Sequence, residues 1–135
     1  MYKRYKESSL QSLTVNQHIA AILKDINKKL QESDRLFRTY KMAESLEIGK
    51  KAIYKSIALA DIMDEYINQT LEQPNHNNDV KSGLKDLQRH FDSLHKMINQ
   101  YVVSRDGTSL ERIVKNLGAM EKFWAELTPI PENND

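Results

Sequence analysis

The chain has 135 residues, no cysteine and a formal net charge of +1, with twenty Lys and Arg residues against nineteen Asp and Glu residues. This length fits one domain that can bury a core without disulfides or a structural metal. The near-neutral balance excludes the strong positive field that recruits nucleic acid, and the lack of cysteine excludes disulfide scaffolds and thiol chemistry.

No apolar run in the sequence approaches the ~20 residues that a membrane-spanning helix needs. The N-terminus also lacks the apolar segment of a secretion signal. We therefore expect a cytoplasmic protein that neither binds nucleic acid nor inserts into a membrane.

Helix-breaking residues are rare, since the chain has only four glycines and three prolines. Thr14 is a good N-cap, and apolar residues follow it at three- and four-residue steps: Val15, Ile19, Ile22, Ile26 and Leu30. They predict a first helix over residues 15–38. A second helix over 43–72 is predicted by a repeat in steps of seven, four and three: Leu46, Ile53, Ile57, Ala60, Met63, Ile67 and Leu71.

Two further helices are predicted beyond the segment EQPNHNND, where Pro74 and the asparagines favour a turn. The apolar residues of the third helix are Val80, Leu84, Leu87, Phe91, Leu94, Ile98 and Tyr101. In the next break, SRDGTS, Gly107 suits a left-handed helix end, and Thr108 or Ser109 suits a cap. The apolar residues of the fourth helix are Leu110, Ile113, Leu117, Met120, Trp124 and Leu127, before Pro129.

The fold class follows from the connections, because short connections make consecutive helices antiparallel neighbours. The sequence therefore predicts an all-α protein, an antiparallel up-down four-helix bundle. We expect an N-terminal arm or cap over residues 1–13, which could form a short extra helix, then the bundle over 14–128. A disordered C-terminal tail is expected over 129–135.

The second helix carries a second apolar stripe, turned about 100° from the first. Its residues are Ile48, Ala52, Leu59, Ile62 and Tyr66. A helix in a bundle touches two neighbours and needs a wide apolar arc, so the stripe could belong to the core. The alternative is a groove that stays open for a partner helix.

Catalytic or ligand-binding groups are few. The histidines are the only acid–base candidates near neutral pH: His18, His76, His90 and His95. His90 and His95 are turned about 140° from each other on a helix, so they do not converge on one ion. Neither is followed by the Lys and Gly of a histidine phosphotransfer site, and the isolated glycines form no phosphate-binding loop. We therefore expect no enzyme, no metal and no cofactor, and function must come from a surface.

Three stretches carry a pattern beyond helical periodicity. Before the first helix stand Tyr2, Tyr5, Leu10, Ser12 and Thr14, and the second helix contains IYKSIALADIMDEYI, with Ile53 and Lys55. The third stretch runs from His90 to Trp124, and its matching residues are Phe91, Leu94, Ile98, Asp106, Leu110, Ile113, Leu117, Met120 and Trp124. Together these stretches resemble a divergent member of the FliS family of flagellar export chaperones.

The resemblance implies a cytoplasmic chaperone that binds the disordered C-terminal region of flagellin and prevents its premature polymerisation before export. The flagellar export gate and a flagellin regulator are further partners that it implies. Candidate partner-binding residues are the arm residues Tyr2, Tyr5 and Leu10 together with the second stripe, Ile48, Ala52, Leu59, Ile62 and Tyr66. The alternative function is a structural or regulatory bundle that self-associates or binds another helical partner.

Overall fold

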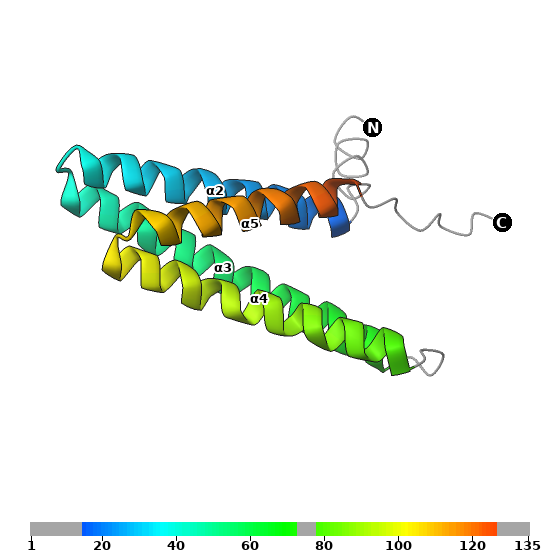
Figure 1. The fold of residues 1–135 in the computed structure, drawn as a ribbon. Coiled ribbons are helices and arrows are strands. Elements are labelled where there is room, and N and C mark those ends of the chain that lie inside the picture. Colours follow the sequence, from blue (N-terminus) through cyan, green and yellow to red (C-terminus); the bar gives the residue numbers. More distant parts are fainter. Residues whose placement is uncertain (1–14, 73–77, 127–135) are drawn as a thin grey trace, which may run out of the picture.

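A computed structural model describes residues 15–72 and 78–126 of the chain. Within these ranges the chain forms four helices, labelled α2 to α5 in Figure 1: α2 (Val15–Arg38), α3 (Met42–Leu71), α4 (Asn78–Ser104) and α5 (Gly107–Glu126). The predicted all-α bundle is confirmed. The first two helices lie within one residue of the predicted ranges, because breakers are few and the apolar repeats are long.

The helices pack in the order α5, α2, α3, α4, so that α2 contacts both α3 and α5, and α3 contacts both α2 and α4. The diagonal pairs share no close backbone approach. Consecutive helices run in opposite directions, as Figure 1 shows. The fourth neighbouring pair, α4 with α5, is much more loosely packed than the other three.

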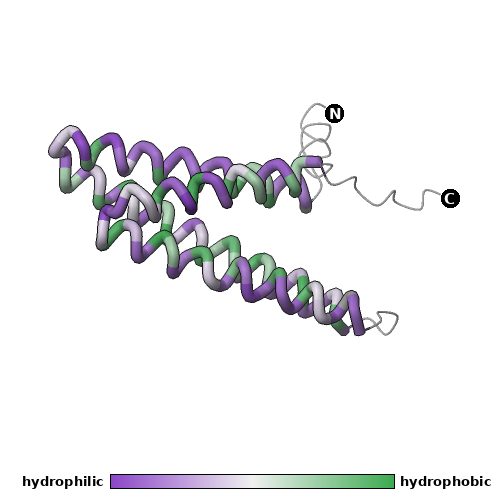
Figure 2. The backbone as a smooth tube through the Cα atoms, viewed as in Figure 1, coloured by the Kyte–Doolittle hydropathy of each residue, from purple (hydrophilic) through white to green (hydrophobic). Residues whose placement is uncertain are grey.

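The core lies along the axis of the bundle, and every helix contributes to it. Figure 2 shows hydrophobic residues recurring at intervals along each helix rather than in one continuous run. The largest completely buried apolar side chains are Tyr101, Phe91, Leu23, Ile26, Leu30, Leu59, Met63, Ile67, Ile98 and Leu117. Full burial of such a side chain contributes ~1.5–3 kcal/mol, so these residues supply much of the stability of the bundle.

In the N-terminal half of α3 the buried face differs from the predicted one, whereas Ala60, Met63 and Ile67 are buried as predicted. Leu46 and Ile57 are 43 % and 38 % exposed, although the apolar repeat assigns them to the core. The buried positions near them are the small residues Ser45, Gly49, Ala52 and Ser56. An alanine Cβ at Gly49 would lie only 3.1 Å from Val102 Cγ2, so α3 and α4 approach each other closely here. Small residues allow this close approach, and the larger apolar side chains lie to the side of the contact.

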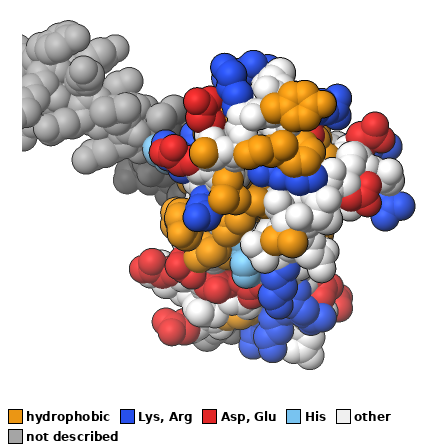
Figure 3. Space-filling view, turned by 90° about the vertical axis from the view of Figure 1, so that its left-hand side faces the viewer, with side chains coloured by type: hydrophobic (Ala, Val, Ile, Leu, Met, Phe, Trp, Pro, Cys, Tyr) orange, Lys and Arg blue, Asp and Glu red, His pale blue; other side chains and the backbone are white. Residues whose placement is uncertain are grey.

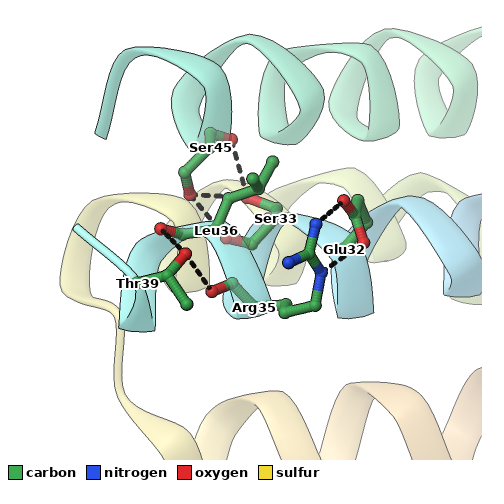
Figure 4. Close-up of polar contacts among 6 residues, drawn as sticks. All are labelled: Glu32, Ser33, Arg35, Leu36, Thr39 and Ser45. Carbon is green, nitrogen blue, oxygen red and sulfur yellow. Dashed lines mark hydrogen bonds and ion pairs between the residues drawn. The ribbon is translucent and has the colours of Figure 1, made fainter. Parts of the chain in front are cut away.

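A polar cluster joins three helices at the end where α2 meets α3. The Ser33 hydroxyl donates to the Ser45 carbonyl at 2.7 Å, and the Ser45 hydroxyl donates to the Ser33 carbonyl at 2.5 Å (Figure 4). Arg105, which follows α4, donates from Nη1 to Ser33 Oγ at 2.9 Å. Its guanidinium also lies 5.0 Å from the ring centroid of Phe37 and 5.5 Å from that of Tyr101. These buried hydroxyls are therefore fully paired, as burial requires.

The turn from α2 to α3 is a Schellman motif, a helix end in which two N–H groups bond back across the last turn. Tyr40 N–H donates to the Phe37 carbonyl at 3.2 Å and Lys41 N–H donates to the Leu36 carbonyl at 2.9 Å. Tyr40 has a positive φ of 63°, at the position where glycine is usual. The Thr39 hydroxyl also lies within hydrogen-bond distance of two carbonyls of this turn, that of Arg35 at 3.0 Å and that of Leu36 at 3.1 Å (Figure 4).

The turn from α4 to α5 corrects the prediction for the segment SRDGTS. The left-handed residue is Arg105, with φ 57°, and Gly107 is instead the first residue of α5. The cap is Asp106, whose carboxylate accepts hydrogen bonds from Thr108 N–H at 3.0 Å and from the Ser109 hydroxyl at 3.3 Å. An aspartate competes well with serine and threonine for this position, because its carboxylate also opposes the positive helix end.

Candidate partner-binding surface

The second stripe on α3 divides into buried and exposed parts. Ala52 and Leu59 have no exposed surface and belong to the core, whereas Ile48 is half-buried. Ile62 is 46 % exposed and Tyr66 is 42 % exposed. They are four residues apart, which places them on the same side of the helix. The surface that this stripe offers is therefore confined to the C-terminal part of α3.

Ion pairs separate Ile48 from that exposed pair. Ile48 lines an open cleft of about 300 Å³ between α2 and α3, together with Asp25, Lys28, Lys29, Glu32 and Lys51. Lys55 follows on the same side of α3 and forms an ion pair with Asp25, which Lys29 contacts at 3.0 Å. The hydrogen bond from Lys55 lowers the pKa of Asp25 below its ordinary value, and the charge of Lys29 acts in the same direction. The stripe is thus interrupted by polar contacts between α2 and α3.

The arm residues Tyr2, Tyr5 and Leu10 lie outside the described residues. The chain that carries them joins the bundle at Val15, where α2 begins. Because α2 and α3 are antiparallel, this point lies at the same end of the molecule as the C-terminal part of α3 (Figure 1). Ile62 and Tyr66 therefore lie near the end at which the arm enters.

Sequence periodicity missed several exposed apolar side chains. Tyr40, Met42, Leu46 and Val103 lie at the end of the bundle that carries the α2–α3 turn and the α4–α5 connection. Figure 3 looks onto this end and shows hydrophobic side chains gathered in its upper part, with acidic and basic side chains separated below them. Phe123 of α5 is also 57 % exposed, and Tyr54 of α3 is 67 % exposed. Tyr54 and Phe123 could have been recognised from the sequence as exposed, because they lie outside the apolar repeats of their helices.

The histidines of the described residues do not converge. His90 Nε2 lies 3.3 Å from Met120 Sδ, whereas His95 Nδ1 is buried and has no hydrogen-bond partner. Across residues 15–72 and 78–126 no group of three or more His, Asp or Glu side chains could hold a metal ion. Carboxylates do gather between α3 and α4, where burial and then the charge of Asp64 raise the pKa of Asp92.

Comparison with known proteins adds no relative. No protein-family model matches the chain, and no curated protein or solved structure shows significant similarity to it. None of the described helices is both long and apolar enough to cross a bilayer. The described residues form a four-helix bundle, and large apolar side chains are exposed on three of its helices, α3, α4 and α5.

Proposed function

We propose that this protein is a chaperone of flagellar export that binds the C-terminal segment of flagellin in the cytoplasm and delays its polymerisation. Two independent features support the proposal. One is the residue pattern of the arm and the last two helices, which resembles the FliS family. The other is the exposed pair Ile62 and Tyr66 at the end where the arm joins the bundle. This pair is the observation that carries the proposal within the described residues.

The physical requirement for such a function is apolar surface that remains accessible in the folded state. A disordered segment that folds on binding loses ~2–5 kcal/mol in ordering, so the partner must cover a large area. The exposed pair Ile62 and Tyr66 of α3 and the exposed Phe123 of α5 provide separate contacts for such a wrapping segment. An export gate or a flagellin regulator would then compete for, or approach, the same surface.

The direct test is co-purification with C-terminal flagellin fragments, followed by calorimetry. We expect a complex whose affinity falls about tenfold or more in Ile62→Asp and Tyr66→Asp, because burying one such side chain is worth ~1.5–3 kcal/mol. Tyr54→Asp is the matched control, since Tyr54 is exposed on the same helix but lies far from that pair. Leu59 is unsuitable for this test because it is completely buried, and its substitution would report on folding.

A flagellin fragment that fails to bind the wild-type protein would overturn the proposed client. Sedimentation at several protein concentrations tests the alternative function in the same preparation. A concentration-dependent dimer that Ile62→Asp dissociates, without any flagellin binding, would favour self-association.

A further inference from the structure

The helix pair α4 and α5 is the open side of the bundle. The two helices are consecutive, yet they share far fewer close backbone approaches than the other neighbouring pairs. Figure 1 shows them diverging from their connection. Large rings lie between them, since the centroids of Phe91 and Trp124 are 6.2 Å apart. Helix separation depends on the side chains at the contact, so these rings hold the backbones apart.

The space along this side has an apolar floor, which we call the α4–α5 seam. Met97 and Ile113 line a cleft of about 250 Å³ together with Gln100, Ser109 and Arg112. Further along, Met120 contacts His90, and the exposed Phe123 ring packs edge-on against Trp124 with centroids 5.7 Å apart. Methionine side chains adapt easily to different partners, and an exposed aromatic ring is a frequent anchor in interfaces.

The two helices that border the seam expose more cations than carboxylates. Arg112 lines the cleft itself, and the other exposed cations of α4 and α5 are Lys85, Arg89, Lys96, Lys115 and Lys122. The exposed carboxylates of the same two helices are Asp79, Asp86, Glu111 and Glu126. Asp86 already pairs with Arg89 at 3.3 Å, and no other cation of this set has an ion-pair partner among the described residues. Lys115 and Lys122 lie within about 80° of Arg112 around α5, on its solvent side.

We propose that the α4–α5 seam binds an amphipathic helix whose apolar stripe is flanked by carboxylates. The apolar floor receives the stripe, and the unpaired cations of the two helices meet the flanking acidic side chains. This inference deepens the proposed function, on which it rests, by assigning a second contact surface and a charge pattern to the bound segment. The surface is distinct from Ile62 and Tyr66, because those residues lie on α3.

The chain has a single tryptophan, Trp124, which borders the seam and serves as the reporter. We would titrate the full-length protein with two synthetic helical peptides that share one leucine stripe and contain no aromatic residue. One peptide has glutamate on both flanks of the stripe and the other has lysine. We expect a saturable change in tryptophan fluorescence with the glutamate peptide, at least about tenfold weaker binding of the lysine peptide, and weaker glutamate-peptide binding at high salt.

Two seam variants and a control separate this site from general charge attraction. The double variant Arg112→Glu with Lys115→Glu should lose the glutamate peptide and gain the lysine peptide. Phe123→Ser should weaken both, and its circular dichroism should remain that of the wild type because Phe123 is largely exposed. The control Lys24→Glu with Lys50→Glu, at exposed positions of α2 and α3, makes the same charge change away from the seam and should bind like the wild type.

Equal binding of the two peptides, or an equal loss in the control double variant, would overturn the proposal. So would unchanged binding of the glutamate peptide by Phe123→Ser. If a flagellin fragment binds but is insensitive to both seam variants, the seam proposal fails and the proposed function stands. If the glutamate peptide binds at the seam while flagellin fragments do not bind, the flagellin proposal fails and the seam stands.

Discussion

The Tyr101 hydroxyl donates a 2.7 Å hydrogen bond to Oδ1 of Asp34, across the diagonal of the bundle from α4 to α2. These helices share no close backbone approach, and it is the length of the tyrosine side chain that lets this hydrogen bond reach from one to the other. The other carboxylate oxygen of Asp34, Oδ2, forms an ion pair with Arg38 Nε at 2.8 Å. A hydrogen bond to a charged acceptor contributes about 1.5–3 kcal/mol, more than an ordinary one.

Tyr101→Phe should therefore lower the free energy of unfolding at pH 7 by about 1–2 kcal/mol, measured by chemical denaturation. Burial, followed by the bond to Asp34, raises the pKa of Tyr101 from 10.0 to about 12. The unfolded chain thus loses this proton first, and wild-type stability should fall as the pH rises from 10 toward 12. The variant lacks this loss, so the two stabilities should converge in that range. Tyr54→Phe is the exposed control, and an equal effect there would contradict the assignment.

Tyr40 and Arg105 both have left-handed backbone conformations, and substitution by glycine should change thermal stability in opposite directions at the two positions. Tyr40 is 85 % exposed, so Tyr40→Gly removes backbone strain and few contacts, and should raise the melting temperature by the equivalent of about 0.5–1 kcal/mol. Arg105→Gly relieves similar strain but loses the bond to Ser33 and the stacking on Phe37 and Tyr101, so it should destabilise the protein. Equal shifts in thermal unfolding would show that the Arg105 side chain contributes nothing.

Gly49 and Gly118 form a second contrasting pair. A Cβ at Gly49 would lie 3.1 Å from Val102 Cγ2 and 3.2 Å from Ser33 Oγ, and the hydrogen bonds of Ser33 prevent it from moving aside. Gly49→Ala should therefore destabilise the protein. Overpacking of this kind costs about 1–3 kcal/mol, which exceeds what alanine gains over glycine in helix propensity. A Cβ at Gly118 would meet no atom of another helix within 4 Å, so Gly118→Ala should stabilise by about 0.5–1 kcal/mol. Urea denaturation of both variants checks the pair, and a stabilising Gly49→Ala would refute the close approach.

Replacing Asp92 by asparagine should increase the stability of the protein, by an amount that depends on pH. Burial comes first among the causes that raise its pKa, and the charges of Asp64 and Asp61 add to it, whereas His95 and Lys96 oppose it. The folded state therefore binds this proton more tightly than the unfolded chain, and the ionised carboxylate weakens the fold above the raised pKa. Asp92→Asn should unfold at higher denaturant concentration at pH 7. The advantage should shrink as the pH falls toward 3.8, the ordinary value.

Asp25→Asn should have the opposite effect on stability over the same pH range. The pKa of Asp25 is lowered, so its ionised form stabilises the folded state above its ordinary pKa, and this contribution is lost as the pH falls through the folded value. The variant should be less stable than the wild type at pH 7 and converge with it in acid. If both variants shift stability in the same direction at pH 7, the charge assignment between α2, α3 and α4 is wrong.

Sequence periodicity predicted the helices well, because their apolar repeats are long and few residues break them. It failed for the N-terminal half of α3, whereas Ala60, Met63 and Ile67 in the C-terminal half are buried as predicted. Counting apolar side chains placed Leu46 and Ile57 inside, whereas the close approach of α4 at Gly49 selects the face of small residues. The spacing of Ser45, Gly49, Ala52 and Ser56, in steps of four and three, is the signal that counting overlooked.

The candidate surface was less predictable than the fold. Exposure of Ile62 and burial of Leu59 both depend on where α2 and α4 contact α3, and no single-helix pattern contains this information. The α4–α5 seam depends on the bulk of Phe91 and Trp124, two residues that periodicity identifies only as core. A surface that results from how far apart two helices lie can be recognised only once their packing is known.

The reciprocal bonds between Ser33 and Ser45 have a consequence for how α2 and α3 align. Each hydroxyl donates to the backbone carbonyl of the other residue, so both bonds form only when these two residues stand opposite each other. A slip of α3 by one helical turn would bring Gly49 or Lys41 to Ser33, leaving a buried hydroxyl without its partner or burying a charge. Apolar contacts impose no such pairing, because hydrophobic burial is non-directional. This pair of serines thus selects one register from several that hydrophobic packing alone would accept.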